Sequence, residues 1–125
     1  MAKSAKPTIL ICDDEEGIRE SFKLILEDLY DLRFATNGLE ALELLKSFTP
    51  SLMLLDIKMP KVHGMEILKR VKQLKPKLPV IIVTGYQSVE MAQEALKIGA
   101  ADYIPKPFES AVIRAAALRC IDSTP

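Results

Sequence analysis

The sequence predicts an α/β fold in which five parallel strands alternate with five helices, a doubly wound (βα)5 arrangement. Five short apolar runs stand out, with starts roughly 20 to 28 residues apart, the length of a compact βα unit. These runs are 8–12, 32–35, 52–55, 80–83 and 102–104. A helical pattern of apolar residues follows each run. Such alternation favours one five-stranded parallel sheet covered by helices on both faces.

The polarity of each run predicts its place in the sheet. The runs at 8–12, 52–55 and 80–83 are apolar throughout, which is typical of strands buried on both faces. The runs at 32–35 and 102–104 are more polar. We therefore expect the first three at the centre of the sheet and the other two at its edges.

The first two helices are predicted by apolar residues that recur at helical spacing. In the first helix, over 16–29, the residues expected to face the core are Ile18, Phe22, Ile25, Leu26 and Leu29. Asn37 and Gly38 open the second helix. Its inward residues are Ala41, Leu42 and Leu45.

The remaining helices are bounded by recognisable start and stop residues. The third helix has Met65, Ile67, Leu68, Val71 and Leu74 on its apolar face, and Pro76 and Pro79 follow its end. Ser88 is the expected N-cap of the fourth helix and Gly99 its C-terminal stop. The fifth helix runs from Glu109 to about Cys120.

Length, composition and charge exclude several classes of protein. The 125 residues have room for one domain, and 49% hydrophobic with 27% charged residues can bury a core. Lys plus Arg and Asp plus Glu both number 17, which disfavours direct binding of nucleic acid through bulk charge. No apolar run approaches the ~18 residues of a membrane span, and no signal-type stretch follows the N-terminus. We expect a cytoplasmic protein without membrane contact.

Cysteine and histidine are too sparse for a disulfide scaffold or a zinc site. Cys12 and Cys120 are the only cysteines and lie near opposite ends of the chain, so we expect reduced thiols. His63 is the single histidine, which argues against a multi-histidine zinc site and against a Ser-His-Asp triad.

Polar residues follow four of the predicted strands. Asp13 and Asp14 follow the first, Asp56 the third, Thr84 ends the fourth, and Lys106 follows the fifth. Each signal is weak by itself, because an aspartate can cap a helix and a threonine or lysine can lie in a solvated turn. The carboxyl ends of parallel strands meet at one edge of the sheet, where α/β proteins bind ligands. The presence of polar residues at the ends of four strands therefore predicts a ligand-binding site at this edge.

These residue types indicate a phosphoryl site that contains a metal ion. Neighbouring carboxylates repel one another and need a cation, and oxygen ligands favour a hard ion such as Mg²⁺. Lys106 supplies a positive charge and Thr84 a hydroxyl donor for phosphate oxygens.

The motifs resemble those of one family. In chain order they are CDD, LLDIKMP followed by HG, VTG, and DYIPKPF. This set is similar to the receiver domain of two-component response regulators, over residues 8–120, with 1–7 as a tail and 121–125 as a tail or the start of a linker. Single-domain sporulation phosphorelay receivers and nitrogen-regulator-type receivers are especially similar. The resemblance implies the flavodoxin-like or CheY-like strand order 2-1-3-4-5.

The resemblance also implies a role for each site residue. Asp56 would be the phosphoacceptor, and Thr84 and Lys106 would contact the phosphoryl oxygens. The ligands of Mg²⁺ or Mn²⁺ would be Asp13, Asp14, Asp56 and the backbone carbonyl of Lys58.

Further roles concern switching and phosphate lifetime. Thr84 and Tyr103 would form the switch, and Lys58 and Tyr86 would flank the phosphoryl group and modulate its loss. The Lys106-Pro107 peptide bond would be cis, and Gly64 suits a tight turn. His63 stands just before this glycine, where the family often has Asp, and would be an exposed loop residue.

The resemblance implies a phosphoacceptor signalling protein rather than an enzyme. Its partners would be a sensor histidine kinase or a histidine phosphotransfer protein. The output surface would comprise the fourth helix, fifth strand and fifth helix, through which a homodimer is one possible arrangement. The terminal Ser-Thr-Pro is compatible with a complete chain and with a receiver cut from a longer regulator.

Two other functions are compatible with part of this pattern. A phosphatase of the haloacid dehalogenase class would also form a phospho-aspartate, but its nucleophile ends the first strand in a D-x-D pattern, whereas Asp13 and Asp14 are adjacent. A degenerate receiver that only binds partners would lack the acidic pair, the acceptor or the lysine, all of which are present.

Overall fold

The computed structural model describes residues 6–58, 64–86 and 88–122. His63 lies outside the described residues. In chain order the elements are β1 (Thr8–Cys12), α1 (Glu16–Leu26), β2 (Asp31–Ala35), α2 (Gly38–Leu45), β3 (Leu52–Leu55), α3 (Gly64–Leu74), β4 (Val80–Thr84), α4 (Val89–Ile98), β5 (Asp102–Pro105) and α5 (Ser110–Asp122).

The five strands form one parallel sheet in the order β2-β1-β3-β4-β5, which confirms the predicted fold and strand order. The apolar strands β3 and β4 are buried at every residue, and β1 at all but its first. Strands β2 and β5 lie at the edges, where their polar residues reach solvent. The polarity of each run therefore predicted its position.

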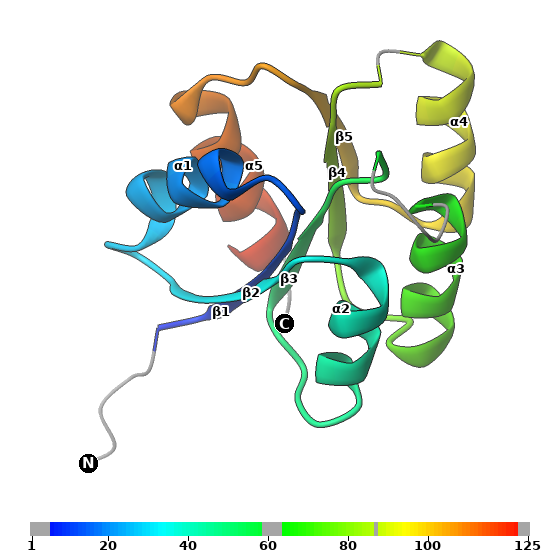
Figure 1. The fold of residues 1–125 in the computed structure, drawn as a ribbon, viewed down its shortest axis with the longest axis horizontal. Coiled ribbons are helices and arrows are strands. Elements are labelled where there is room, and N and C mark those ends of the chain that lie inside the picture. The colour runs from blue at the N-terminus through cyan, green and yellow to red at the C-terminus, as the bar shows by residue number, and fades with distance from the viewer. Residues whose placement is uncertain (1–5, 59–63, 87, 123–125) are drawn as a thin grey trace.

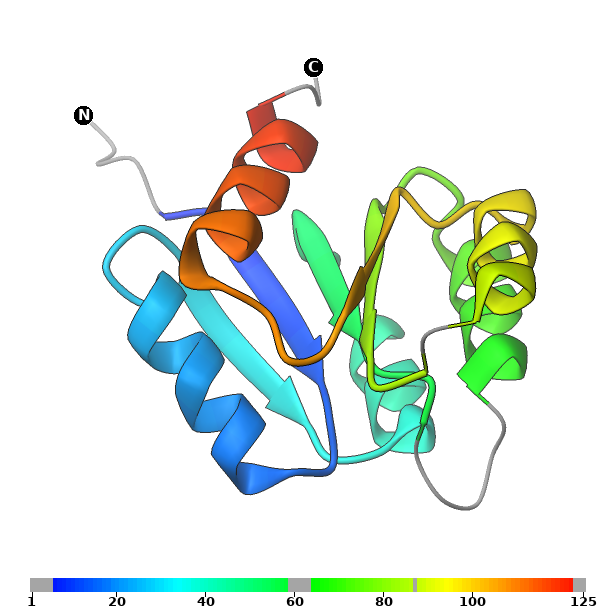
Figure 2. The same ribbon diagram turned by 90° about the horizontal axis from the view of Figure 1, so that it is seen from above.

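Helices cover both faces of the sheet. Figures 1 and 2 show α1 and α5 on one face and α2, α3 and α4 on the other. Each face has its own core: Phe22, Leu26 and Ile113 belong to the first, and Leu45, Ile67 and Leu68 to the second. Among the described residues, no helix has the length and apolar character needed to cross a membrane.

Local side chains begin and end the helices as predicted. The Asn37 side chain accepts the backbone N–H of Glu40 at 2.8 Å, and the Ser88 hydroxyl accepts that of Met91 at 3.2 Å. Gly99 ends α4 with φ at 125°, a conformation that costs glycine little because it has no Cβ.

Two apolar residues expected to face the core are exposed. Leu29 is 51% exposed, because α1 ends at Leu26 and the chain then turns, so that Tyr30 is buried in its place. Leu74, the last residue of α3, is 43% exposed. Both predictions were wrong because helical spacing was continued to or past the end of a helix. Helix α5 ends at Asp122, two residues beyond the predicted end.

The sheet hydrogen bonds continue past the strand ends and anchor the residues that follow. The N–H of Asp13 donates to the carbonyl of Ala35 at 3.1 Å, and that of Asp56 donates to Cys12 at 3.0 Å. The N–H of Lys106 donates to the carbonyl of Thr84 at 2.8 Å. Three predicted site residues are thereby held at the same edge of the sheet.

Candidate functional site

Three of the polar residues predicted at the strand ends, Asp14, Asp56 and Lys106, line one small cavity. Its volume is about 330 Å³, and its lining residues are Asp14, Glu15, Asp56, Lys58, Gly85 and Lys106. They come from the segments that follow β1, β3, β4 and β5. The cavity therefore lies at the carboxyl edge of the sheet, where the sequence placed a site.

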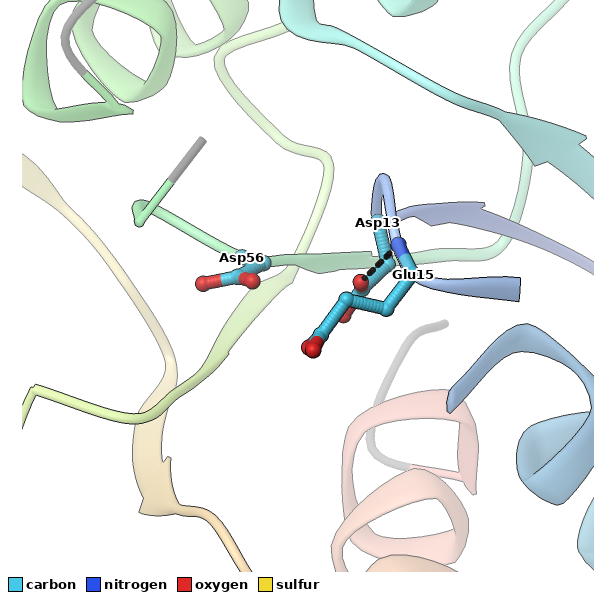
Figure 3. Close-up of side chains that lie close together, drawn as sticks. All are labelled: Asp13, Glu15 and Asp56. Atoms are coloured by element: carbon cyan, nitrogen blue, oxygen red, sulfur yellow. Dashed lines mark hydrogen bonds between the residues drawn. The ribbon is translucent and has the colours of Figure 1, made fainter. Parts of the chain in front are cut away.

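Three carboxylates gather beside this cavity. Figure 3 shows the side chains of Asp13, Glu15 and Asp56 close together, and one oxygen of each lies within 4.8 Å of the others. Asp13 and Asp56 are buried, whereas Glu15 is exposed. The sequence analysis missed Glu15, although it directly follows Asp13 and Asp14 in an acidic run.

The ammonium group of Lys106 pairs with all three carboxylates. Its Nζ lies 2.9 Å from Asp13 Oδ2 and 3.0 Å from both Glu15 Oε1 and Asp56 Oδ2. Burial acts to lower the pKa of Lys106, but the hydrogen bonds to the three carboxylates outweigh it and raise the pKa above its ordinary value. Lys106 is therefore the positive centre of the cluster.

Asp13 is a buried member of the cluster rather than a helix cap. Its Oδ1 accepts the backbone N–H of Glu15 at 2.9 Å, and burial raises the pKa of its carboxyl against the opposing effect of Lys106. Glu15 is the N-cap residue of α1 and its side chain makes no capping hydrogen bond. Arg19 donates to the backbone carbonyl of Asp13 at 2.9 Å, a contact that no sequence pattern indicated.

Both carboxylate oxygens of Asp56 have partners. Oδ1 accepts the backbone N–H of Lys58 at 2.8 Å, and Oδ2 pairs with Lys106. The Lys58 ammonium lies 5.4 Å from the centre of the Tyr86 ring, within the range of a cation–π contact. Lys58 and Tyr86, which were predicted to flank the phosphoryl group, thus contact each other.

Thr84 and Tyr103 meet at the backbone of Tyr86. Thr84 is fully buried, and its Oγ1 accepts the Tyr86 N–H at 3.4 Å. The Tyr103 hydroxyl donates to the Tyr86 carbonyl at 2.8 Å, and burial together with the charge of Asp56 raises the pKa of that hydroxyl. The Lys106-Pro107 bond is cis, as predicted.

Gly64 begins α3 directly against the segment that carries Asp56. A Cβ added at Gly64 would overlap the backbone of Ile57, so a larger residue would displace one of the two segments. This close approach explains the glycine that the sequence associated with a tight turn.

The donor set suits a hard divalent cation. Its side-chain donors are carboxylate oxygens, two of them on buried residues, and buried carboxylates need a positive partner. The three carboxylates whose oxygens lie within 4.8 Å of one another are those of Asp13, Glu15 and Asp56. Asp14 lines the cavity beside them. The residues present therefore fit Mg²⁺.

Comparisons with known proteins place the chain in one family. The family model for the response regulator receiver domain matches residues 9–118. The chain is 41% identical over 107 residues to sporulation initiation phosphotransferase F of Bacillus subtilis (strain 168), covering 85% of this chain and 86% of the relative. It is 41% identical over 103 residues to the regulatory protein AtoC of Escherichia coli (strain K12), covering 81% of this chain but only 22% of that longer relative.

A solved structure gives the same result for the fold. The response regulator receiver domain protein (CheY-like) from Methanospirillum hungatei JF-1 is 36% identical, superposes with a TM-score of 0.90 and covers 96% of each chain. Together with the match over residues 9–118, this assigns the chain to the response regulator receiver domains of two-component signalling.

Proposed function

We propose that this receiver accepts a phosphoryl group on Asp56 from the phosphohistidine of a sensor histidine kinase or a histidine phosphotransfer protein. The observation that carries the proposal is the position of Asp56. Its carboxylate borders a cavity open to solvent, 3.0 Å from the Lys106 ammonium and beside two further carboxylates.

The transfer exchanges one bond to phosphorus for another. A carboxylate oxygen of Asp56 attacks phosphorus, the P–N bond to the donor histidine breaks, and its electron pair remains on the imidazole. Lys106 then turns one donor toward a phosphoryl oxygen, and the Thr84 hydroxyl donates to another. A Mg²⁺ or Mn²⁺ ion held by Asp13, Asp14, Asp56 and the carbonyl of Lys58 would neutralise charge on the carboxylates and the phosphoryl oxygens.

The backbone of Tyr86, which is hydrogen-bonded to both Thr84 and Tyr103, would transmit the effect of phosphorylation to the output surface. Because the Tyr86 backbone bonds to both Thr84 and Tyr103, a new bond from Thr84 to the phosphoryl group would disturb the position of Tyr103. The surface of α4, β5 and α5 would then change between two packings. That surface would contact a downstream effector, or a second copy of the chain in a homodimer. The chain would act as a phosphoacceptor and not as an enzyme with an external product.

Intact-mass measurement after incubation with acetyl phosphate tests the proposal. The wild type should gain one phosphoryl group only when Mg²⁺ is present, and Asp56→Asn, which keeps the side-chain shape, should gain none. The label should be lost in acid or base, as expected of an acyl phosphate. An acid-stable label on Ser or Thr, or full labelling of Asp56→Asn, would contradict the assignment.

A further inference from the structure

Glu15 contacts the phosphoacceptor site, and the proposed transfer gives it no role. Its Oε1 lies 3.0 Å from the Lys106 ammonium. Its side chain is 61% exposed, against 2% for Asp13 and 3% for Asp56, the two other partners of Lys106. Among these three carboxylates, Glu15 is therefore the one that water can readily hydrate.

We infer that Glu15 is a positioning residue that holds Lys106 in the unphosphorylated protein and disfavours an anion at Asp56. The inference depends on the proposed function, because it concerns the charge balance of that reaction. Lys106 must form a new bond to a phosphoryl oxygen, and Glu15 competes with that oxygen for the ammonium group.

The geometry indicates which bond is given up. A lysine ammonium has three donor hydrogens, and three carboxylate oxygens lie 2.9, 3.0 and 3.0 Å from the Lys106 nitrogen. Separation from buried Asp13 would leave a buried charge with one partner fewer, which is costly. Separation from Glu15 costs less, because water replaces the lost bond. Glu15 is thus the partner that Lys106 exchanges for the phosphoryl group.

After Lys106 has left Glu15, the Glu15 carboxylate still disfavours an anion at Asp56. The Glu15 N–H is bonded to Asp13 Oδ1 at 2.9 Å, which holds its backbone beside the site. Its carboxylate remains near the cavity and repels a phosphoryl group through partly screened charge. Lys58, the other cation among the described residues that line this cavity, lies over the Tyr86 ring, 5.4 Å from its centre. Competition for Lys106 and electrostatic repulsion by Glu15 therefore both weaken the binding of an anion at Asp56.

A direct metal bond from Glu15 would produce the opposite result. The Glu15 carboxylate belongs to the group of three that could hold a cation. If its main contribution were to bind Mg²⁺, its removal would weaken the binding of any phosphoryl group that depends on that ion. The sign of the change therefore separates the two roles.

The test uses beryllofluoride, a phosphoryl stand-in, at saturating Mg²⁺ with the whole chain. Glu15→Gln keeps the side-chain length and removes the charge, and we expect it to bind beryllofluoride about two- to fivefold more tightly than the wild type, the range for an exposed charge pair. The gain should shrink at high ionic strength, because salt screens the lost charge. The backbone N–H signals of Lys58 and Gly85 report binding by NMR.

Two variants control for other effects of the substitution. Glu16→Gln removes an exposed charge from the adjacent residue, in the first turn of α1, and should bind as the wild type does. Glu15→Asp keeps the charge, and its affinity for beryllofluoride should stay close to that of the wild type. Mg²⁺ affinity, measured separately for each protein, confirms saturation.

Several results would overturn the inference. Weaker or unchanged binding in Glu15→Gln, or an equal gain in Glu16→Gln, would show that Glu15 does not restrain Lys106. These results would leave the proposed function intact as long as wild-type Asp56 is phosphorylated. If the wild type took up neither beryllofluoride nor a phosphoryl group, the proposed function itself would fail and the inference with it.

Discussion

The hydroxyl of Tyr103 donates a 2.8 Å hydrogen bond to the backbone carbonyl of Tyr86. The N–H of Tyr86 donates in turn to the hydroxyl of Thr84, at 3.4 Å. The backbone of one residue thus joins the end of β4 to the aromatic side chain on β5. We therefore expect a change at Thr84 to affect the position of Tyr103 through this connection.

Thr84→Ala should separate phosphorylation from output. The substitution removes one hydroxyl donor, worth about 1 kcal/mol, so the rate of phosphorylation should fall by no more than about tenfold. The NMR shifts that phosphorylation causes in α4 and α5 should become much smaller. Thr49→Ala, which removes a hydroxyl bonded to Lys75, serves as the control. Wild-type shift changes in Thr84→Ala would show that Thr84 is not the link.

The lifetime of the phosphoryl group should depend on Lys58 and Tyr86. These side chains contact each other at the cavity, and a long lysine stem beside a ring can cover the path by which water attacks in line. The double variant Lys58→Ala/Tyr86→Ala should therefore lose phosphate faster than the wild type. Following intact mass over time measures the loss.

The control for phosphate lifetime is Lys69→Ala, which removes an exposed lysine from α3. Equal or slower loss of phosphate in the double variant would show that neither Lys58 nor Tyr86 shields phospho-Asp56.

Mg²⁺ should stabilise the folded chain by binding to the carboxylate cluster. At about ten times its Kd, a ligand that binds only the native state adds about 1.4 kcal/mol to the free energy of unfolding, or about 5 °C in Tm for a domain of this size. Asp13→Asn should lose most of this shift, because it removes a buried anionic oxygen. Glu20→Gln, on the exposed part of α1, should retain it. A wild-type Tm that does not respond to Mg²⁺ would contradict the proposed ion site.

Stability at alkaline pH should depend on Lys72. Its ammonium donates to the Leu78 carbonyl at 2.7 Å, and burial lowers its pKa below the ordinary value of 10.5. Below the folded-state pKa, Lys72 is charged in both states and the native state bears the cost of burial. As pH rises through that pKa toward 10.5, the native state loses its proton first, so the contribution of Lys72 to stability increases.

Urea unfolding from pH 7 to pH 10 measures this effect as the difference in the free energy of unfolding between the wild type and Lys72→Met. The wild type should gain stability relative to the variant as pH rises. Lys69→Met, an exposed substitution on the same helix, should show no such relative change. A difference between wild type and Lys72→Met that does not vary with pH would contradict the prediction.

Patterns of a few residues were sufficient to predict the architecture. Asn37, Ser88 and Gly99 end or begin helices through bonds and backbone angles that involve only near neighbours, so their roles were readable from the chain. The apolar runs likewise predicted which strands are central, because burial on both faces requires apolar side chains on both. Leu29 was misplaced because its exposure depends on where α1 ends and how the chain then turns toward β2.

The sequence by itself determined that carboxylates and a lysine follow parallel strands, and hence that they gather at one edge of the sheet. Only the tertiary structure decided which of the consecutive acids Asp14 and Glu15 joins the ammonium of Lys106, 91 residues from Glu15 in the chain. The turn after β1, tied by the bond from the Glu15 N–H to Asp13, directs the Glu15 carboxylate toward Lys106. Adjacent acids have nearly the same local chemistry, so the choice between them depends on distant segments that only folding brings together.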